Sequence, residues 1–352
     1  MNRRVGFVVV SSAVVALAMP SLAVARSKVV YAGGPVKWSH SLGRYGAGVN
    51  NFLIHRVTIN VGDTVVWNGA SLANGFHTVD IPKLNGSDLA LITATGNMVQ
   101  GVNDAAGNPF WFNGKVPMLS FNTALFGPSG PKAYNGTTRI DSGLPLSPKP
   151  HDFKVKFMTP GAFKYYCDVH PGMGGTVVVK AKGAPVPTAQ QDASALSSEE
   201  QGYVSEAKRV DKTKAPANQV SVGASGPGGL EVYAMFPHTL VINAGTTVRF
   251  FMSKDSREAH TASFGPASFL KTLAGSFNGP APSPAAIYPS DPPGHIVLTP
   301  TSHGNGFANV GAMDRDSTTP LPAFGAITFT TPGTYRYQCL IHPFMHGTVI
   351  VK

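Results

Sequence analysis

Two seven-residue segments place a cysteine, a histidine and a methionine at one spacing, Cys-x-x-His-x-x-Met. They run from Cys167 through His170 to Met173, and from Cys339 through His342 to Met345. A loop this short can wrap a thiolate, an imidazole and a thioether around one metal ion as it leaves a strand. Two imidazoles, one thiolate and a weak axial thioether form the donor set that selects copper in blue sites. Zinc prefers four comparably strong donors, so we expect copper and one more histidine per site.

An internal repeat identifies that additional histidine. Residues 55–67 and 238–250 share His, Ile-Asn, Gly, Thr-Val and a final aromatic residue at a constant offset of 183, and at this offset His77-Thr78 aligns with His260-Thr261. Residues 159–179 match 331–351 at an offset of 172, so the first copy carries 11 more residues between its halves. The chain is a tandem duplication. The expected metal ligands are His77, Cys167, His170 and Met173 in the first copy, and His260, Cys339, His342 and Met345 in the second.

The residues around these motifs alternate between apolar and polar, as strands do. Phe163, Tyr165 and Cys167 lie on one side of the expected strand, so the cysteine shares the inward face with two aromatic residues. Val57, Ile59 and Val61 alternate in the same way before a Gly-Asp turn. Short strands in units of about 130 to 155 residues predict an all-β chain of two Greek-key β-sandwiches.

With these motifs, the sequence resembles the cupredoxins, the plastocyanin and amicyanin group of type 1 copper proteins. The resemblance covers roughly residues 28–182 and 219–352 and is carried by the ligand motifs of both copies. It implies a cupredoxin-like fold in each copy and two type 1 copper ions per chain. Plastocyanin-like sites usually have Asn directly after the first histidine, where this chain has Thr78 and Thr261. The surroundings of each metal therefore differ from the family's pattern.

The N-terminus has the pattern of an export signal. Arg3-Arg4 forms a basic start, Val5–Leu17 is mostly apolar, and Ala23-Val24-Ala25 supplies a small-residue cleavage pattern. We expect a signal peptide at residues 1–25 and a mature protein that is periplasmic or extracellular.

The remaining chain is expected to form cupredoxin-like domain 1 at residues 28–182, a linker at 183–218 and cupredoxin-like domain 2 at 219–352. Within the linker, Ser197 and Glu200 have the spacing of a capping box. Tyr203, Ala207 and Val210 follow on one helical face. One short helix is therefore expected in the linker.

Composition excludes several classes of protein. The formal charge is +10, but the basic residues are scattered and form no run of five, so nucleic acid is not an expected partner. No stretch after the signal reaches about 18 unbroken apolar residues, so no integral membrane span is expected. Two cysteines exclude a disulfide-dense scaffold and any four-cysteine metal centre. The expected partners are redox proteins in transient contact, and the oligomeric state stays open.

Three functions compete at this stage. The first is a copper electron carrier, and the second is a protein that holds or delivers copper. The third is a two-domain copper oxidoreductase of the nitrite reductase or laccase type, which needs a second kind of copper centre joined through a histidine beside the cysteine. The neighbours here are Tyr166 and Asp168, then Gln338 and Leu340, and the chain has no His-x-His. The carrier is therefore favoured and no enzyme activity is expected.

Several residues have a plainer interpretation as well. Each cysteine could be a core residue, or the two could pair in a disulfide, and either methionine could serve packing alone. His55 and His238 are expected at the entrance to a strand, in surface or hydrogen-bonding roles. Phe110-Trp111-Phe112 lies in a long insert and serves either packing or a surface that docks a partner or shields the copper. The loop histidine is expected to expose one ring edge at the domain tip, framed by Pro171-Gly172 or by Pro343-Phe344.

Overall fold

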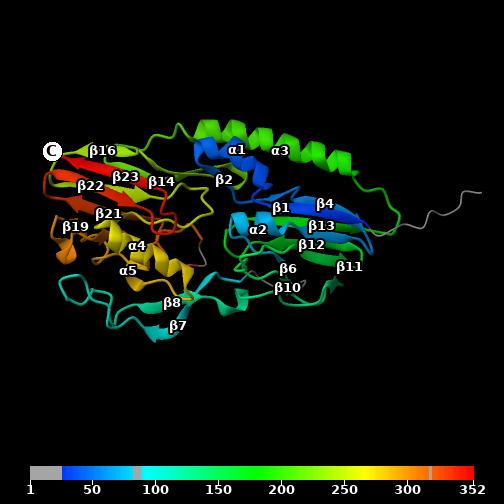
Figure 1. Ribbon diagram of the computed structural model, residues 1–352, viewed down its shortest axis with the longest axis horizontal. Helices are drawn as coiled ribbons and strands as arrows, with labels where there is room; N and C mark the ends of the chain where they lie inside the picture. Colours follow the sequence, from blue (N-terminus) through cyan, green and yellow to red (C-terminus); the bar gives the residue numbers. More distant parts are fainter. Residues whose placement is uncertain (1–25, 82–88, 317–318) are drawn as a thin grey trace, which may run out of the picture.

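The structure is a computed structural model that describes residues 26–81, 89–316 and 319–352. The expected signal peptide lies outside these residues. The chain forms two β-sandwiches that lie end to end along the long axis (Figure 1). The prediction of an all-β chain that forms two β-sandwiches is confirmed.

The first sandwich packs two five-stranded sheets. In spatial order, one sheet contains β3 (Phe52–Leu53), β1 (Ser27–Ala32), β5 (Thr64–Trp67), β11 (Phe153–Phe157) and β9 (Ala133–Tyr134). The other contains β10 (Ile140–Asp141), β6 (Asp80–Ile81), β12 (Gly161–Tyr166), β13 (Gly174–Lys180) and β4 (Arg56–Asn60). The apolar residues that alternate along these strands are buried between the sheets, with Trp67 edge-on to Tyr165 at 5.1 Å between ring centroids.

The second sandwich repeats this strand order. One sheet contains β19 (Val297–Leu298), β21 (Phe324–Phe329), β17 (Thr246–Phe251), β14 (Gln219–Gly226), β15 (Leu230–Phe236) and β2 (Ala47–Val49). The other contains β16 (Thr239–Ile242), β23 (His346–Val351), β22 (Gly333–Gln338), β18 (Ser263–Phe264) and β20 (Ala308–Asn309). The repeat in the sequence is therefore a repeat in structure.

Strand β2 belongs to the first repeat but completes a sheet of the second. It pairs antiparallel with β15, placing Val49 opposite Leu230, Gly48 opposite Glu231 and Ala47 opposite Val232. At the offset of 183, residues 47–49 are equivalent to residues 230–232. Equivalent segments thus pair with each other in opposite directions, which is the arrangement that a local twofold axis produces.

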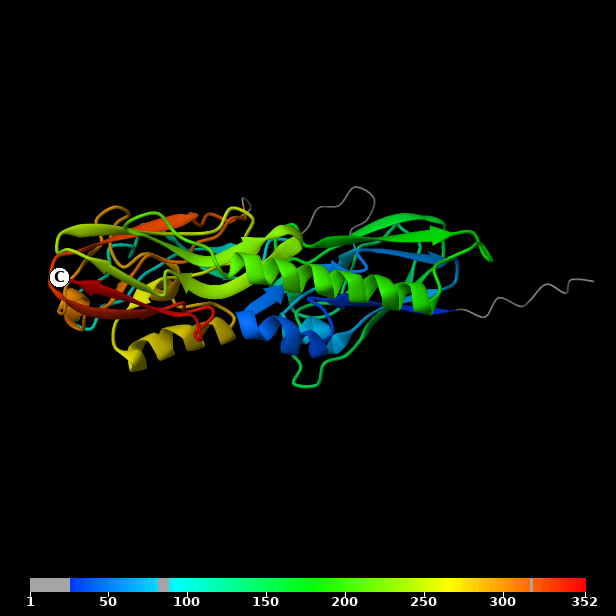
Figure 2. The same ribbon diagram turned by 90° about the horizontal axis from the view of Figure 1, so that it is seen from above.

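A helix connects the two sandwiches along one side (Figures 1 and 2). The expectation of a short helix was wrong in length, because this helix, α3 (Ala189–Val210), has 22 residues. It begins with a capping box between Thr188 and Gln191. The expected capping box at Ser197 and Glu200 was wrong, because both residues lie inside the helix. Ala207 and Val210 are buried, as the periodicity predicted, in a core shared by both repeats.

The long inserts of the two repeats pack on each other. The first carries a two-stranded sheet of β7 (Ile92–Met98) and β8 (Pro117–Phe121), beside α4 (Ala267–Gly275) and α5 (Pro284–Ile287) of the second (Figure 1). Phe110 and Phe112 are buried in one apolar cluster with Leu340, which follows Cys339. The aromatic insert therefore serves packing and covers the cysteine loop of the second repeat.

The remaining helical segments are short. They are η1 (Val36–Trp38), α1 (Ser39–Leu42), η2 (Gly43–Tyr45), α2 (Gly69–Asn74), η3 (Thr123–Leu125), η4 (Pro227–Gly229), η5 (Ser276–Asn278) and η6 (Ser302–Gly304). Among the residues that the structure describes, no helix combines the length and apolar character that crossing a membrane requires.

Candidate metal centres

Each Cys-x-x-His-x-x-Met segment folds as a closed loop between two paired strands. In the first repeat the Cys167 N–H donates to the Met173 carbonyl at 2.9 Å, and the Met173 N–H donates to the His170 carbonyl at 3.0 Å. The second repeat repeats both bonds, at 3.0 Å from Cys339 to Met345 and 2.8 Å from Met345 to His342. These bonds hold the histidine and the cysteine of each loop toward the same point.

The first site brings three expected ligands together inside the sandwich. The Nδ1 atoms of His77 and His170 are 2.9 Å apart, and the Cys167 Sγ lies 3.9 Å and 3.5 Å from them. All three residues are buried. Burial, and then the facing His170 ring, lower the pKa of His77 well below its usual range, which favours the neutral imidazole that binds metals.

The second site has nearly the same geometry. The Nδ1 atoms of His260 and His342 are 3.1 Å apart, and the Cys339 Sγ lies 3.8 Å and 3.9 Å from them. Burial raises the pKa of Cys339, but its contacts with the two imidazoles outweigh burial and hold it well below the usual range. The geometry therefore favours the thiolate, the form of cysteine that binds metals.

The two methionines lie beside these clusters. Met173 is 0% exposed and Met345 is 1% exposed, and each belongs to the apolar core that also contains its cysteine. Their role as axial ligands stays a prediction. Both cysteines are free, so the alternative of a Cys167–Cys339 disulfide is excluded.

The donor sets fit copper, and glycines fix the orientation of the first histidine of each set. A Cβ at Gly75 would lie 2.1 Å from the His77 Nε2, and one at Gly223 would lie 2.9 Å from the His260 Nε2. Both Nε2 atoms are buried without a hydrogen-bond partner among the described residues. Each ring thus presents Nδ1, not Nε2, to the thiolate. The resulting set of two imidazole nitrogens and one soft sulfur suits copper.

Thr78 and Thr261 tie the cysteine loops in place. The backbone N–H of each threonine donates to the cysteine Sγ at 3.4 Å. Each hydroxyl oxygen accepts from the backbone N–H of the residue after the cysteine, at 2.8 Å from Asp168 and 2.7 Å from Leu340. Threonine therefore tethers each loop from the position directly after the first histidine.

Glu258 lies between the two sites and belongs to no motif of the sequence. Its Oε1 is 3.4 Å from the His170 Nε2, and its Oε2 is 3.5 Å from the His342 Nε2. Burial raises the pKa of Glu258, but the facing imidazoles outweigh burial and hold the pKa well below its usual range. Burial lowers the pKa of His170, but Glu258 and then Cys167 outweigh burial and raise the pKa to about 10. The sequence does contain one feature that could have pointed to Glu258. At the offset of 183, the first repeat has Gly75 at the equivalent position, so the acid is present in only one of the two repeats.

The expectation of an exposed histidine edge at each domain tip was wrong for the first repeat. His170 is only 3% exposed, because the second repeat lies over it. The second repeat keeps part of this feature, since Phe344 is 66% exposed and the His342 side chain is 17% exposed. His55 and His238 lie at the surface, as predicted.

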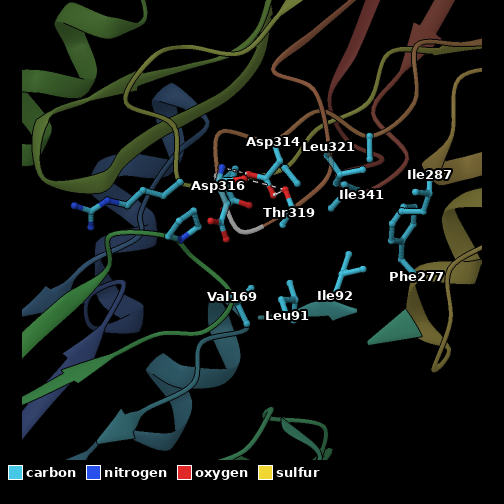
Figure 3. Close-up of a pocket in the computed structure, with 15 residues that line it drawn as sticks. Leu91, Ile92, Val169, Phe277, Ile287, Asp314, Asp316, Thr319, Leu321 and Ile341 are labelled. Atoms are coloured by element: carbon cyan, nitrogen blue, oxygen red, sulfur yellow. Dashed lines mark hydrogen bonds between the residues drawn. The ribbon is translucent and has the colours of Figure 1, made fainter. Parts of the chain in front are cut away.

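A small cavity of about 40 Å³ opens beside Glu258 (Figure 3). Figure 3 shows Val169 of the first loop facing it, with Leu91 and Ile92 near one side and Ile341 on another. Its lining is mostly apolar, and it has room for only a few water molecules.

Comparisons with known proteins give structural neighbours only. No protein-family model matches the chain, and no curated protein matches it. Solved structures that resemble it include oxidised plastocyanin from Dryopteris crassirhizoma, at 19% identity and a TM-score of 0.21, covering 38% of this chain and 99% of that one. Amicyanin from Paracoccus versutus is similar at 20% identity and a TM-score of 0.22, covering 41% of this chain and 88% of that one.

Proposed function

We propose that this protein is an exported blue-copper protein that transfers single electrons and holds one type 1 copper ion in each repeat. The observation that carries the proposal is the duplicated cluster of two imidazole Nδ1 atoms and one cysteine Sγ, all within 4 Å of each other. Copper bound there would supply a one-electron couple. Repeats 28–182 and 219–352 are proposed as the two copper-holding units, each with a methionine, Met173 or Met345, as the weak axial ligand.

The chain's own residues would keep each site in one geometry. The closed loop, the threonine tether and the glycines that enclose the first histidine leave the donors little freedom to rearrange. A rigid donor set suits electron transfer, because little has to move when the charge of the site changes. A protein that delivers copper would instead need a ligand that opens readily, and here His77, Cys167 and His170 are all buried.

The proposal places the protein in the periplasm or outside the cell, with redox proteins as transient partners. The exposed Phe344 beside His342 is the proposed contact point for such a partner. Brief redox encounters bury little surface, so a small apolar patch is enough.

Copper titration of the full chain tests the proposal. We expect two coppers per chain, strong thiolate-to-copper absorption and narrow copper hyperfine splitting in the EPR spectrum. Cys167→Ser and Cys339→Ser should each remove about half of the absorption, because each thiolate serves one site. A third tightly bound copper with a type 2 signal, together with turnover of nitrite or phenols, would overturn the carrier function in favour of an oxidoreductase. Loss of all colour from either single substitution would contradict two separate sites.

A further inference from the structure

We propose that Glu258 joins the two metal sites into one electron-conducting unit, in which the second site takes electrons from outside and passes them to the first. This inference rests on the proposed function, because it assumes copper in both sites. No bridge between the sites was expected from the sequence, and Glu258 is assigned here as a residue that positions both loop histidines.

The bridge is a continuous series of contacts. In each loop histidine, Nδ1 faces its own cysteine and Nε2 faces Glu258, so each ring lies between its site and the carboxylate. The two carboxylate oxygens are divided between the rings, at 3.4 Å from His170 and 3.5 Å from His342. The Glu258 side chain is only 9% exposed, so these contacts are screened by solvent far less than contacts at the surface are.

Both repeats hold the carboxylate in place. Asn50 of the first repeat donates to Oε1 at 2.7 Å, and the Tyr233 hydroxyl of the second donates to the same oxygen at 2.6 Å. Asn50 and Tyr233 are equivalent residues at the offset of 183, so the two donors approach from equivalent positions. A buried charge is costly unless it is paired and hydrogen-bonded, and Glu258 has both kinds of partner.

The two sites differ in their access to solvent. Arg257 lies beside the loop around His170, since a Cβ at Gly172 would lie 3.6 Å from the Arg257 Nε, and His170 itself is only 3% exposed. Arg257 is itself fixed by donating to the Asn50 carbonyl at 2.7 Å. His342 instead contacts the exposed Phe344, at 6.0 Å between ring centroids. An external donor therefore reaches the second site directly, and the first site receives electrons through the bridge.

One electron moves in each exchange. The second site is reduced by an external one-electron donor, then oxidised as it gives that electron to the first site, which is reduced. Glu258 and both imidazoles keep their bonds and their protons throughout, so the exchange needs no other reactant.

Stopped-flow reduction of the copper-loaded full chain by hexaammineruthenium(II) tests the inference, with the thiolate-to-copper absorption as the readout. In the wild-type protein both sites should bleach in one phase. In Glu258→Ala the fast phase should fall to half its amplitude, and the other half should follow in a slower phase. Glu258→Gln should behave in the same way while keeping the size of the side chain, because an amide is uncharged and has only one oxygen to place against the two rings.

Matched variants separate the bridge from general damage. Glu231→Gln changes another buried acid of the same repeat, which contacts Ser225 and Arg257 but neither loop histidine, and should keep one phase. Cys167→Ser leaves only the second site, which should bleach at the rate of the fast phase. Cys339→Ser leaves only the first site, which should bleach at the rate of the slow phase. Single-phase bleaching in both Glu258 variants, or two phases in the wild type, would overturn the bridge and leave the proposed function standing. Absence of thiolate-to-copper absorption in the wild type would overturn the proposed function and the bridge together.

Discussion

At the scale of single residues, the cysteine loops are held by threonine hydroxyls. Thr78 and Thr261 each use the backbone N–H toward the sulfur and the side chain toward the next residue of the loop. The N–H to sulfur bond is a backbone feature that survives most substitutions, whereas the tether depends on the hydroxyl. The two contributions can therefore be separated by mutation.

Thr78→Val and Thr261→Val should each weaken copper binding at their own site by about 10- to 100-fold, the usual effect of losing a group that orients metal ligands. Valine keeps the shape of threonine but leaves the N–H of Asp168 or Leu340 without its acceptor. Competition with a copper(I) chelator measures the change, and Thr→Ser at the same positions is the control that should retain affinity. Equal affinity in the valine and wild-type proteins would show that the tether has no part in metal binding.

The sequence predicted well which histidines and cysteines come together in each site. The repeat alone singled out His77 and His260, and the structure brings each of them to its cysteine and loop histidine. Glu258 could not be found in that way, because its role depends on how the two repeats dock. Docking is set by many surface contacts, such as those of Asn50 and Arg257, that carry no motif in the sequence.

At the scale of elements, the insert of the first repeat is held on the second partly by one histidine. His303 lies between Asp104 of the first insert and Asp291, at 3.3 Å from each. Burial lowers the pKa of His303, but Asp291 and then Asp104 outweigh burial, and the pKa is raised above its usual value. Because the folded state favours the protonated form, this contact stabilises the protein below about pH 6.5 and is lost as the pH rises through the raised pKa.

The thermal midpoint of the wild-type protein should therefore fall more between about pH 6 and pH 9 than that of His303→Gln. The variant removes the ionisable ring, so subtracting its pH dependence from that of the wild type isolates this contribution. Thermal unfolding followed by circular dichroism measures both. Parallel curves for the two proteins would mean that His303 does not titrate against the two acids.

The linker shows why element boundaries were harder to predict than element types. The periodicity of Ala207 and Val210 correctly gave a helix with one buried face. Its start was placed too late, because Thr188 and Gln191 form the real capping box. Ser197 and Glu200 have the same spacing but are already within helix, where the backbone N–H groups are bonded to earlier carbonyls.

At the scale of the whole molecule, the two repeats are not independent domains, because segments of the first repeat are part of the fold of the second. Strand β2 and the insert around Phe110 and Phe112 both leave the first repeat to complete the second. The sequence predicted two similar units but did not indicate that segments of the first repeat pack on the second. The similarity of two repeats does not determine which of them a given segment packs against. The division at residues 182 and 219 stays a prediction.

A fragment of residues 219–352 should consequently be less stable than the same residues in the full chain, and should self-associate. Removing β2 leaves β15 with an unpaired edge, which is a template for pairing with another chain. Sedimentation and thermal unfolding measure the two effects, and adding a separate fragment of residues 26–216 should restore the monomeric second repeat as a one-to-one complex. A monomeric fragment 219–352 with the stability of the full chain would contradict this account.

The local twofold axis has a consequence for the origin of the bridge. In a homodimer of two identical chains, any residue near the axis is present twice, so an acid at the position of Glu258 would meet its own copy in one buried space. Two such carboxylates would repel each other and could not both be satisfied by the same pair of imidazoles. Covalent fusion of the copies removes this restriction, because Gly75 and Glu258 can differ at equivalent positions. In the proposed electron path, this difference would give a symmetric scaffold a direction, from the second site to the first.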